Sequence, residues 1–363
     1  MKNLFKVFIV LLILITSLMP NLIFATEYAD TLRVGIYYDA ASVKSLTLSS
    51  DTGFSLGGVL DRTLEVVDVS DSSTLTVEAD RTDGVPSHYV SYFTCATVNE
   101  ATSKAEELRS NDGIEVFFGY IDSVYHVLVG GFKSQEDVLL ALENSELQGM
   151  PIGVTQKGLR VKDDQGKIVF ILDDLTNGLG VYRKDYAESE GFIKISGSAK
   201  GTYRGGFECK SLDGESITVV NVIPVEDYLY SVVCREMSPS WEVEALKAQA
   251  VCARNFALGR INYHKKYGFD VCRTVCCQAY SQEADNSSSV HTAVDETRGE
   301  LLFYDNKLVQ AVYSSSMGAR TESVENVWGS KFPYLVSVEN PYEDTENIYN
   351  GKWTKTLTKA RAT

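Results

Sequence analysis

The chain has 363 residues, of which 44% are hydrophobic and 23% are charged, and its formal net charge is −15 at pH 7. The length is typical of two domains, and the composition is that of a folded globular protein. The negative charge argues against a nucleic-acid-binding protein and against electrostatic docking on an anionic membrane, because both surfaces would repel the chain.

The first 25 residues are predicted to be a signal peptide. Lys2 and Lys6 precede an apolar run at residues 7–19, and the Ile-Phe-Ala sequence at 23–25 suits cleavage by signal peptidase. The run is shorter than the ~20 apolar residues that a membrane-spanning helix needs. An uncleaved N-terminal anchor is the alternative. Either interpretation places the remainder of the chain outside the cytoplasmic membrane.

Residues 26–82 are predicted to be rich in β-strands, because alternating segments are separated by turn residues. Residues 83–152 then follow the order strand, helix, strand, strand, helix, which predicts a small ferredoxin-like (βαββα) module. Its strands are expected at 89–94, 114–120 and 125–131, and its helices at 101–108 and after Ser134, which has capping-box spacing with Asp137. Strand signals return from residue 153, with pairing to the strands before the module as one option.

Two helices are predicted on either side of a Met-Ser-Pro break at residues 237–239. The apolar residues recur at helical spacing, namely Tyr228, Leu229, Val232 and Val233 before the break and Val243, Leu246, Ala250, Ala253 and Ala257 after it. Ser240 is the predicted N-cap of the second helix. Glu236 lies at the break, and Lys247 and Arg254 share one edge of the second helix. The alternative interpretation is an amphipathic pair of helices whose charges are solvated.

Seven cysteines leave at least one thiol unpaired if the others form disulfides. Three of them cluster at Cys272, Cys276 and Cys277, and His264 lies upstream. Thiolates and an imidazole suit zinc, although the side chains of adjacent cysteines normally diverge. A disulfide and free thiols are the alternatives. The other four cysteines lack metal-binding spacing and are expected to be small buried side chains.

The segment 226–258 resembles the signature of the SpoIID/LytB family, E-x-Y-L-x-G-V-V-x-x-E-M-x-x-x-W-x-x-E-A-L-K-A-Q-A-V-x-A-R. Two further segments, at 201–206 and 314–338, are similar to other blocks of the same family. The departures from the pattern are Ser231 for Gly, Cys252 for Ala and Ala319 for Gly.

The resemblance implies a mixed α+β catalytic domain over residues 153–363, in which a helical hairpin bears the active-site Glu236. The family cleaves peptidoglycan glycan strands as lytic transglycosylases, so Glu236 would be the catalytic acid/base. The matching loops and helix edge suggest Lys247, Arg254, Gln278 and Ser315 as substrate-binding residues, with ion pairing as the alternative for the two cations. We expect an exported protein, in the cell wall or on the outer face of the cytoplasmic membrane.

The same resemblance bears on the cysteine cluster, because some family members hold a zinc ion in an H…C…C-Q-x-Y segment. Cys272, Cys277 and Gln278 match that pattern, Cys276 stands where His is frequent, and His264 lies somewhat far upstream. A structural zinc held by Cys272 and Cys277, with Cys276 or His264 completing the shell, is therefore expected.

Residues 83–152 resemble a SPOR domain, a module that binds glycan strands stripped of peptides. Tyr89, Tyr92 and Tyr125 are candidate stacking surfaces, although about half of such aromatic side chains must fill the small core. An unrelated small α+β module is the alternative. The SpoIID/LytB domain usually continues beyond a segment like residues 353–358, so a C-terminal truncation is expected. A different function, that of a non-catalytic amidase enhancer or glycan-binding module, stays open.

Overall fold

The computed structural model describes residues 28–342 except 61, 112–113, 146, 175, 187–190, 198–199 and 282–286. The predicted signal peptide and the segment 353–358 lie outside the described residues. No helix within the described part of the chain is both long and apolar enough to cross a membrane. From Thr31 onward the chain clusters as one unit, in which two large sheets and a few helices confirm the α+β class.

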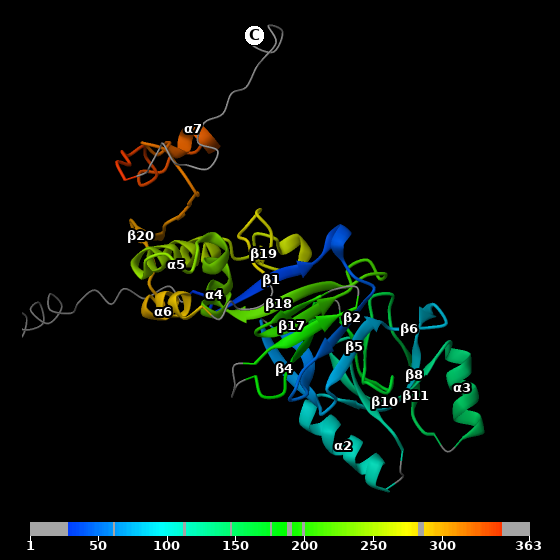
Figure 1. The fold of residues 1–363 in the computed structure, drawn as a ribbon. Coiled ribbons are helices and arrows are strands. Elements are labelled where there is room, and N and C mark those ends of the chain that lie inside the picture. The colour runs from blue at the N-terminus through cyan, green and yellow to red at the C-terminus, as the bar shows by residue number, and fades with distance from the viewer. Residues whose placement is uncertain are drawn as a thin grey trace, which may run out of the picture. The chain divides into compact units, whose positions relative to one another are not determined.

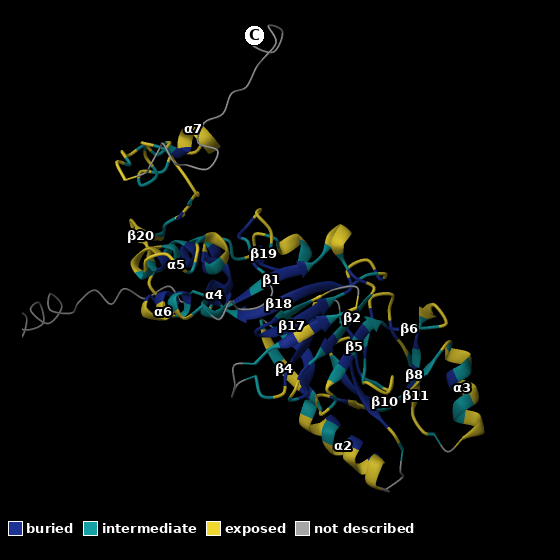
Figure 2. Cartoon of the chain, viewed as in Figure 1, coloured by how far each residue is buried: buried dark blue, intermediate teal, exposed yellow. Residues whose placement is uncertain are grey.

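The first sheet has seven strands in the order β19-β1-β18-β17-β14-β3-β4 (Figure 1). In that order the strands are Val271–Cys272, Thr31–Tyr37, Thr218–Pro224, Gly206–Lys210, Gly178–Arg183, Phe54–Leu60 and Thr63–Ser70. All neighbours are antiparallel except β1 and β19. The central strands are buried along nearly their whole length (Figure 2), which explains their continuous apolar runs.

The second sheet has ten strands in the order β11-β8-β10-β9-β13-β12-β5-β2-β15-β16. In that order they are Met150–Gly153, His88–Cys95, Val124–Phe132, Phe117–Ile121, Ile168–Asp173, Leu159–Lys162, Thr74–Ala79, Ser45–Ser49, Ile193–Ser196 and Gly201–Tyr203. Strands from before and after residues 83–152 pair directly, β12 with β5 and β15 with β2. The pairing that the sequence left as an option is therefore confirmed.

Residues 88–144 have the predicted order of strand, helix, strand, strand and helix. One more strand, β11, follows at Met150–Gly153. The helices are α2 (Val98–Asn111) and α3 (Gln135–Asn144), and the Ser134 hydroxyl caps α3 by accepting the Asp137 N–H at 3.1 Å. Strand β9 also pairs in parallel with β13, so this part of the chain shares its sheet with the flanking strands. Tyr89 and Tyr125 are buried and fill the core, so neither offers a stacking surface, whereas Tyr92 is partly exposed.

Three helices pack against one another beside the first sheet: α4 (Val225–Glu236), α5 (Val243–Leu258) and α6 (Ser288–Glu296). Helix α4 follows β18 without a loop and also contacts β1. The predicted apolar faces are buried in both α4 and α5, apart from Val243, which is partly exposed. The predicted cap is wrong, because residues 238–242 form a turn and α5 begins only after Glu242.

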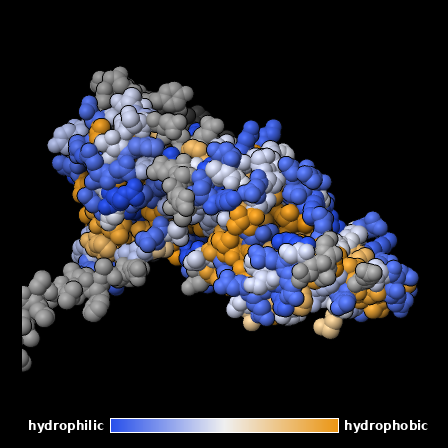
Figure 3. Space-filling model, turned by 90° about the horizontal axis from the view of Figure 1, so that it is seen from below, coloured by the Kyte–Doolittle hydropathy of each residue, from blue (hydrophilic) through white to orange (hydrophobic). Residues whose placement is uncertain are grey.

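The remaining described elements are short. They are the strands β6 (Arg81–Thr82), β7 (Val85–Pro86), β20 (Phe303–Tyr304) and β21 (Lys307–Leu308), the helix α7 (Val324–Trp328), and the 3-10 turns η1 (Asp39–Ala41) and η2 (Lys265–Tyr267). Most of the surface drawn in Figure 3 is hydrophilic, with separate hydrophobic patches. Large exposed apolar side chains are frequent after residue 300, including Phe303 and Trp328.

Candidate functional site

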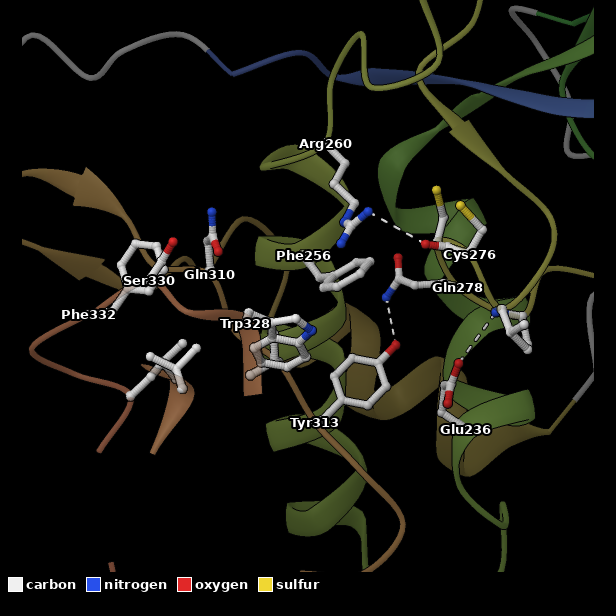
Figure 4. A pocket seen from close by; sticks show the side chains of 16 residues that line it. Glu236, Phe256, Arg260, Cys276, Gln278, Gln310, Tyr313, Trp328, Ser330 and Phe332 are labelled. Carbon is white, nitrogen blue, oxygen red and sulfur yellow. Dashed lines mark hydrogen bonds between the residues drawn. The ribbon is translucent and has the colours of Figure 1, made fainter. Parts of the chain in front are cut away.

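A cavity of about 720 Å³ lies between the helices, the loop after α5 and the segment after β21 (Figure 4). It is lined by Glu236, Phe256, Arg260, Val275, Cys276, Cys277, Gln278, Ala279, Gln310, Val312, Tyr313, Val324, Trp328, Ser330, Phe332 and Leu335. Nine of these sixteen residues are aromatic or aliphatic, and Glu236 is the one carboxylate among them. Such a cavity suits a ligand with apolar faces and a small number of polar contacts.

Glu236 is the last residue of α4, and its side chain lies at the edge of this cavity. The backbone turns to an extended conformation at Met237, so the carboxylate is presented beyond the helix end. Its Oε1 accepts a hydrogen bond of 3.4 Å from the Ala279 N–H. The Glu236 side chain is exposed, and Trp241, which follows the same break, is 55% exposed and does not line the cavity.

Gln278 lines the cavity on the side of α4, and only 2% of its surface is exposed. Its Oε1 accepts the Tyr228 hydroxyl at 3.1 Å, and its Nε2 donates to Ala253 O at 3.3 Å and to the Tyr313 hydroxyl at 2.9 Å. Burial raises the pKa of Tyr313, and the nearby Glu236 carboxylate raises it further. Both ends of the amide are thus used within the protein, so Gln278 positions Tyr313 beside Glu236.

The loop that carries the cavity wall is anchored by Asp270, which is fully buried. Arg62 donates to both carboxylate oxygens at 2.6 and 2.8 Å, and the backbone N–H groups of Asn262 and Arg33 donate at 2.9 and 3.0 Å. Four donors satisfy this buried charge. No local sequence pattern identifies Asp270, because its partner Arg62 lies 208 residues away.

His264, Cys272, Cys276 and Cys277 come together at the end of this loop, as the sequence predicted. One ligand atom from each lies within 4.8 Å of all the others. The His264 Nε2 is 3.3 Å from the Cys277 sulfur and 3.9 Å from the Cys276 sulfur. A tetrahedral zinc with bonds of about 2.0–2.3 Å holds its ligands roughly 3.4–3.8 Å apart, so this donor set fits a metal ion.

The cluster forms because a turn brings His264 close to Cys272 and because the sulfurs of the adjacent Cys276 and Cys277 both reach it. The turn η2 ends at Gly268 with φ of 82°, and the His264 N–H then donates to Asp270 O, which folds His264 back toward Cys272. Cys276 is exposed and Cys277 is buried, yet both sulfurs reach the cluster. Cys272, Cys276 and Cys277 are all free thiols, and a hydrogen bond with Cys277 is the main cause that lowers the pKa of Cys272.

The other predicted binding residues lie elsewhere. Arg254 is 1% exposed and forms a bidentate ion pair with Glu226 at 2.7 and 3.0 Å, so its predicted contact with substrate is wrong. Lys247 forms ion pairs with Glu244 and Glu296 at 2.7 and 2.6 Å, the alternative role given above. Neither cation lines the cavity, and the exposed Ser315 does not line it either.

Comparison with known proteins matches residues 213–304 to a family model described as the Stage II sporulation protein, SpoIID. This chain carries a SpoIID/LytB-family domain. The matched segment contains Glu236, Asp270 and the His/Cys cluster. It does not include residues 83–152, whose SPOR-like character stays a prediction.

Three relatives support the assignment. The amidase enhancer of Bacillus subtilis is 42% identical over 131 residues, which are 36% of this chain and 17% of the relative. Stage II sporulation protein D of the same organism is 33% identical over 156 residues, or 39% and 45% of the two chains. An uncharacterized protein of Brachyspira hyodysenteriae is 42% identical over 125 residues, 34% of each. The chain therefore spans less than half of each of these relatives.

We predict that Arg254→Met lowers the free energy of unfolding by about 3–5 kcal/mol, because Glu226, whose side chain is only 12% exposed, would keep its charge without its partner. Lys247→Met is the matched control, and its exposed ion pairs predict little change. The double change Glu226→Leu/Arg254→Met should recover much of the loss. Urea denaturation measures the stability of all three variants. An Arg254→Met protein that is as stable as the native protein but binds glycan poorly would instead support a substrate-binding role for Arg254.

Proposed function

We propose that this protein is exported and cleaves peptidoglycan glycan strands as a lytic transglycosylase, with Glu236 as its single acid/base. The observation that carries the proposal is that Glu236 is the one carboxylate among the described residues that line the cavity. The family domain, and the sporulation and cell-wall roles that the relatives' names suggest, support it.

A single carboxylate limits the possible chemistry. Hydrolytic glycosidases place two carboxyl groups about 5–9.5 Å apart, one to protonate the leaving oxygen and one to attack or to activate water. One carboxyl group suffices if the substrate supplies the nucleophile. Glu236 would protonate the glycosidic oxygen as its bond to C1 breaks, then accept the proton of the muramyl C6 hydroxyl as O6 bonds to C1. The product is a 1,6-anhydromuramyl end, and no water is consumed.

Glu236 must be protonated when the glycosidic bond breaks, although its side chain is exposed. A glycan that fills the cavity would replace the water around the carboxyl group, and such a low-dielectric surrounding favours the neutral acid. Tyr313 and the Ala279 N–H would keep the carboxyl group oriented during this change. The aromatic side chains of Phe256 and Trp328 would supply apolar surface on the cavity wall.

A structural zinc ion at the His/Cys cluster is part of the proposal. Three thiolates and one imidazole complete a tetrahedral shell, which leaves no open position for water. When bound, the ion would cross-link the loop, while His264, Cys272, Cys276 and Cys277 would hold it. Cys276 and Cys277 also line the cavity, so the cluster would fix the backbone that reaches Glu236 through Ala279.

A second candidate is a non-catalytic enhancer that presents glycan strands to a cell-wall amidase. The similarity to the amidase enhancer of Bacillus subtilis and the exposure of Glu236 favour this alternative. Residues 83–152 would then contribute a SPOR-like binding surface. A protein of this kind would bind strands without shortening them.

We predict that Glu236→Gln slows strand cleavage at least about a hundredfold, the usual scale for the loss of a general acid. The substitution keeps the shape and removes the transferable proton. Glu242→Gln is the matched control, since that exposed residue adjoins α5 and does not line the cavity. Release of soluble fragments from peptide-free glycan is the measurement. Equal rates for the native and Glu236→Gln proteins would remove Glu236 from the mechanism.

We also predict about one zinc per chain, which elemental analysis of protein prepared under reducing conditions would detect. Thiol titration should find three cysteines protected until a chelator is added. Cys277→Ser should lose the metal and unfold more readily, because metal binding contributes folding free energy. Cys209→Ser, at a buried thiol outside the cluster, is the control. Three freely titrating thiols and no zinc would rule out the site.

A further inference from the structure

Arg260 is a cation that faces the cavity without a carboxylate partner among the described residues. The guanidinium lies over the rings of Phe256 and Tyr263, with its central carbon 4.3 and 4.6 Å from their centroids. Its hydrogen bond to Cys276 O is long, at 3.5 Å. Figure 4 shows the side chain extending from the end of α5 over Phe256. The two rings hold the planar group in place and leave most of its five N–H donors available.

The chain has 49 acidic residues against 34 lysines and arginines, so carboxylates that could pair with an arginine are plentiful. Arg62, Arg183 and Arg254 each form ion pairs with nearby carboxylates. Glu236 is the one carboxylate on the described cavity wall, and no ion pair joins it to Arg260 among the described residues. The cavity therefore presents a fixed guanidinium to whatever fills it.

Arg260 and Glu236 contact the same short segment of backbone. Arg260 donates to the carbonyl of Cys276, and Glu236 accepts from the N–H of Ala279. Three residues span at most about 11 Å between their Cα atoms. A group bound by Arg260 would thus lie close to the bond on which Glu236 acts.

We propose that Arg260 recognises a carboxylate of the bound glycan and thereby determines which strands the cavity accepts. This inference rests on the proposed function. A guanidinium fork matches a carboxylate with two parallel hydrogen bonds, and the aromatic wall reduces competition from water. The carboxylate has two possible sources on peptidoglycan: the lactyl group of a muramic acid that lacks a peptide, and the stem peptide itself.

The test measures binding in the full chain carrying Glu236→Gln, so that its result does not depend on cleavage. Three ligands are compared: peptide-free strands, the same strands after their lactyl carboxylates are converted to methylamides, and strands that keep their stem peptides. Arg260→Gln should weaken binding of a carboxylate-bearing ligand about tenfold or more and leave the methylamide unchanged. Arg260→Lys keeps the charge without the fork and should give an intermediate loss.

The outcomes separate the sources and the alternatives. A loss confined to peptide-free strands assigns the lactyl carboxylate, and a loss confined to stem-bearing strands assigns the peptide. Equal loss for all three ligands, or no loss for any, overturns the inference. Metal content is measured in parallel, because Arg260 also lies near Cys276. If Arg260→Gln loses the metal and all binding together, Arg260 supports the cluster and the inference fails. Failure of cleavage in the native protein would contradict only the proposed function.

Discussion

The cavity depends on the hydrogen bonds that the buried Asp270 carboxylate accepts from Arg62 and from two backbone N–H groups. The loop after α5 contains little regular structure, and Asp270 ties it both to β1, through the Arg33 backbone, and to Arg62. A fully buried carboxylate is stable only when donors surround it, and here four donors do so. Because the His264 N–H donates to Asp270 O and Cys272 lies two residues further on, the same anchor brings the His/Cys cluster together.

The short segment 276–279 contacts the His/Cys cluster, Tyr313 and Glu236. Its thiols belong to the His/Cys cluster, its buried Gln278 orients Tyr313, and its Ala279 N–H reaches Glu236. A change at the cluster would therefore move the backbone that contacts the carboxylate. A metal ion at the proposed site would therefore influence the geometry of Glu236 without any role in bond breaking.

Local sequence patterns predicted the parts of the fold that local forces determine. The apolar periodicity of α4 and α5 and the cap of α3 were correct, because each depends on residues a few positions apart. Helical periodicity also placed Lys247 and Arg254 on one edge, but it could not show that Arg254 is buried against Glu226. The pairing of β9 with β13, the Arg62–Asp270 ion pair and the aromatic cavity wall from residues 324–335 join distant segments, and no short motif encodes them.

We propose that one carboxyl group acts with a nucleophile that belongs to the substrate. The most direct measurement is mass spectrometry of the ends formed when the native protein cleaves peptide-free strands in water enriched in ¹⁸O. Intramolecular attack by the muramyl hydroxyl predicts 1,6-anhydromuramyl ends without ¹⁸O, because no water enters the product. Reducing ends that carry ¹⁸O would show that water is the nucleophile, and would contradict the account.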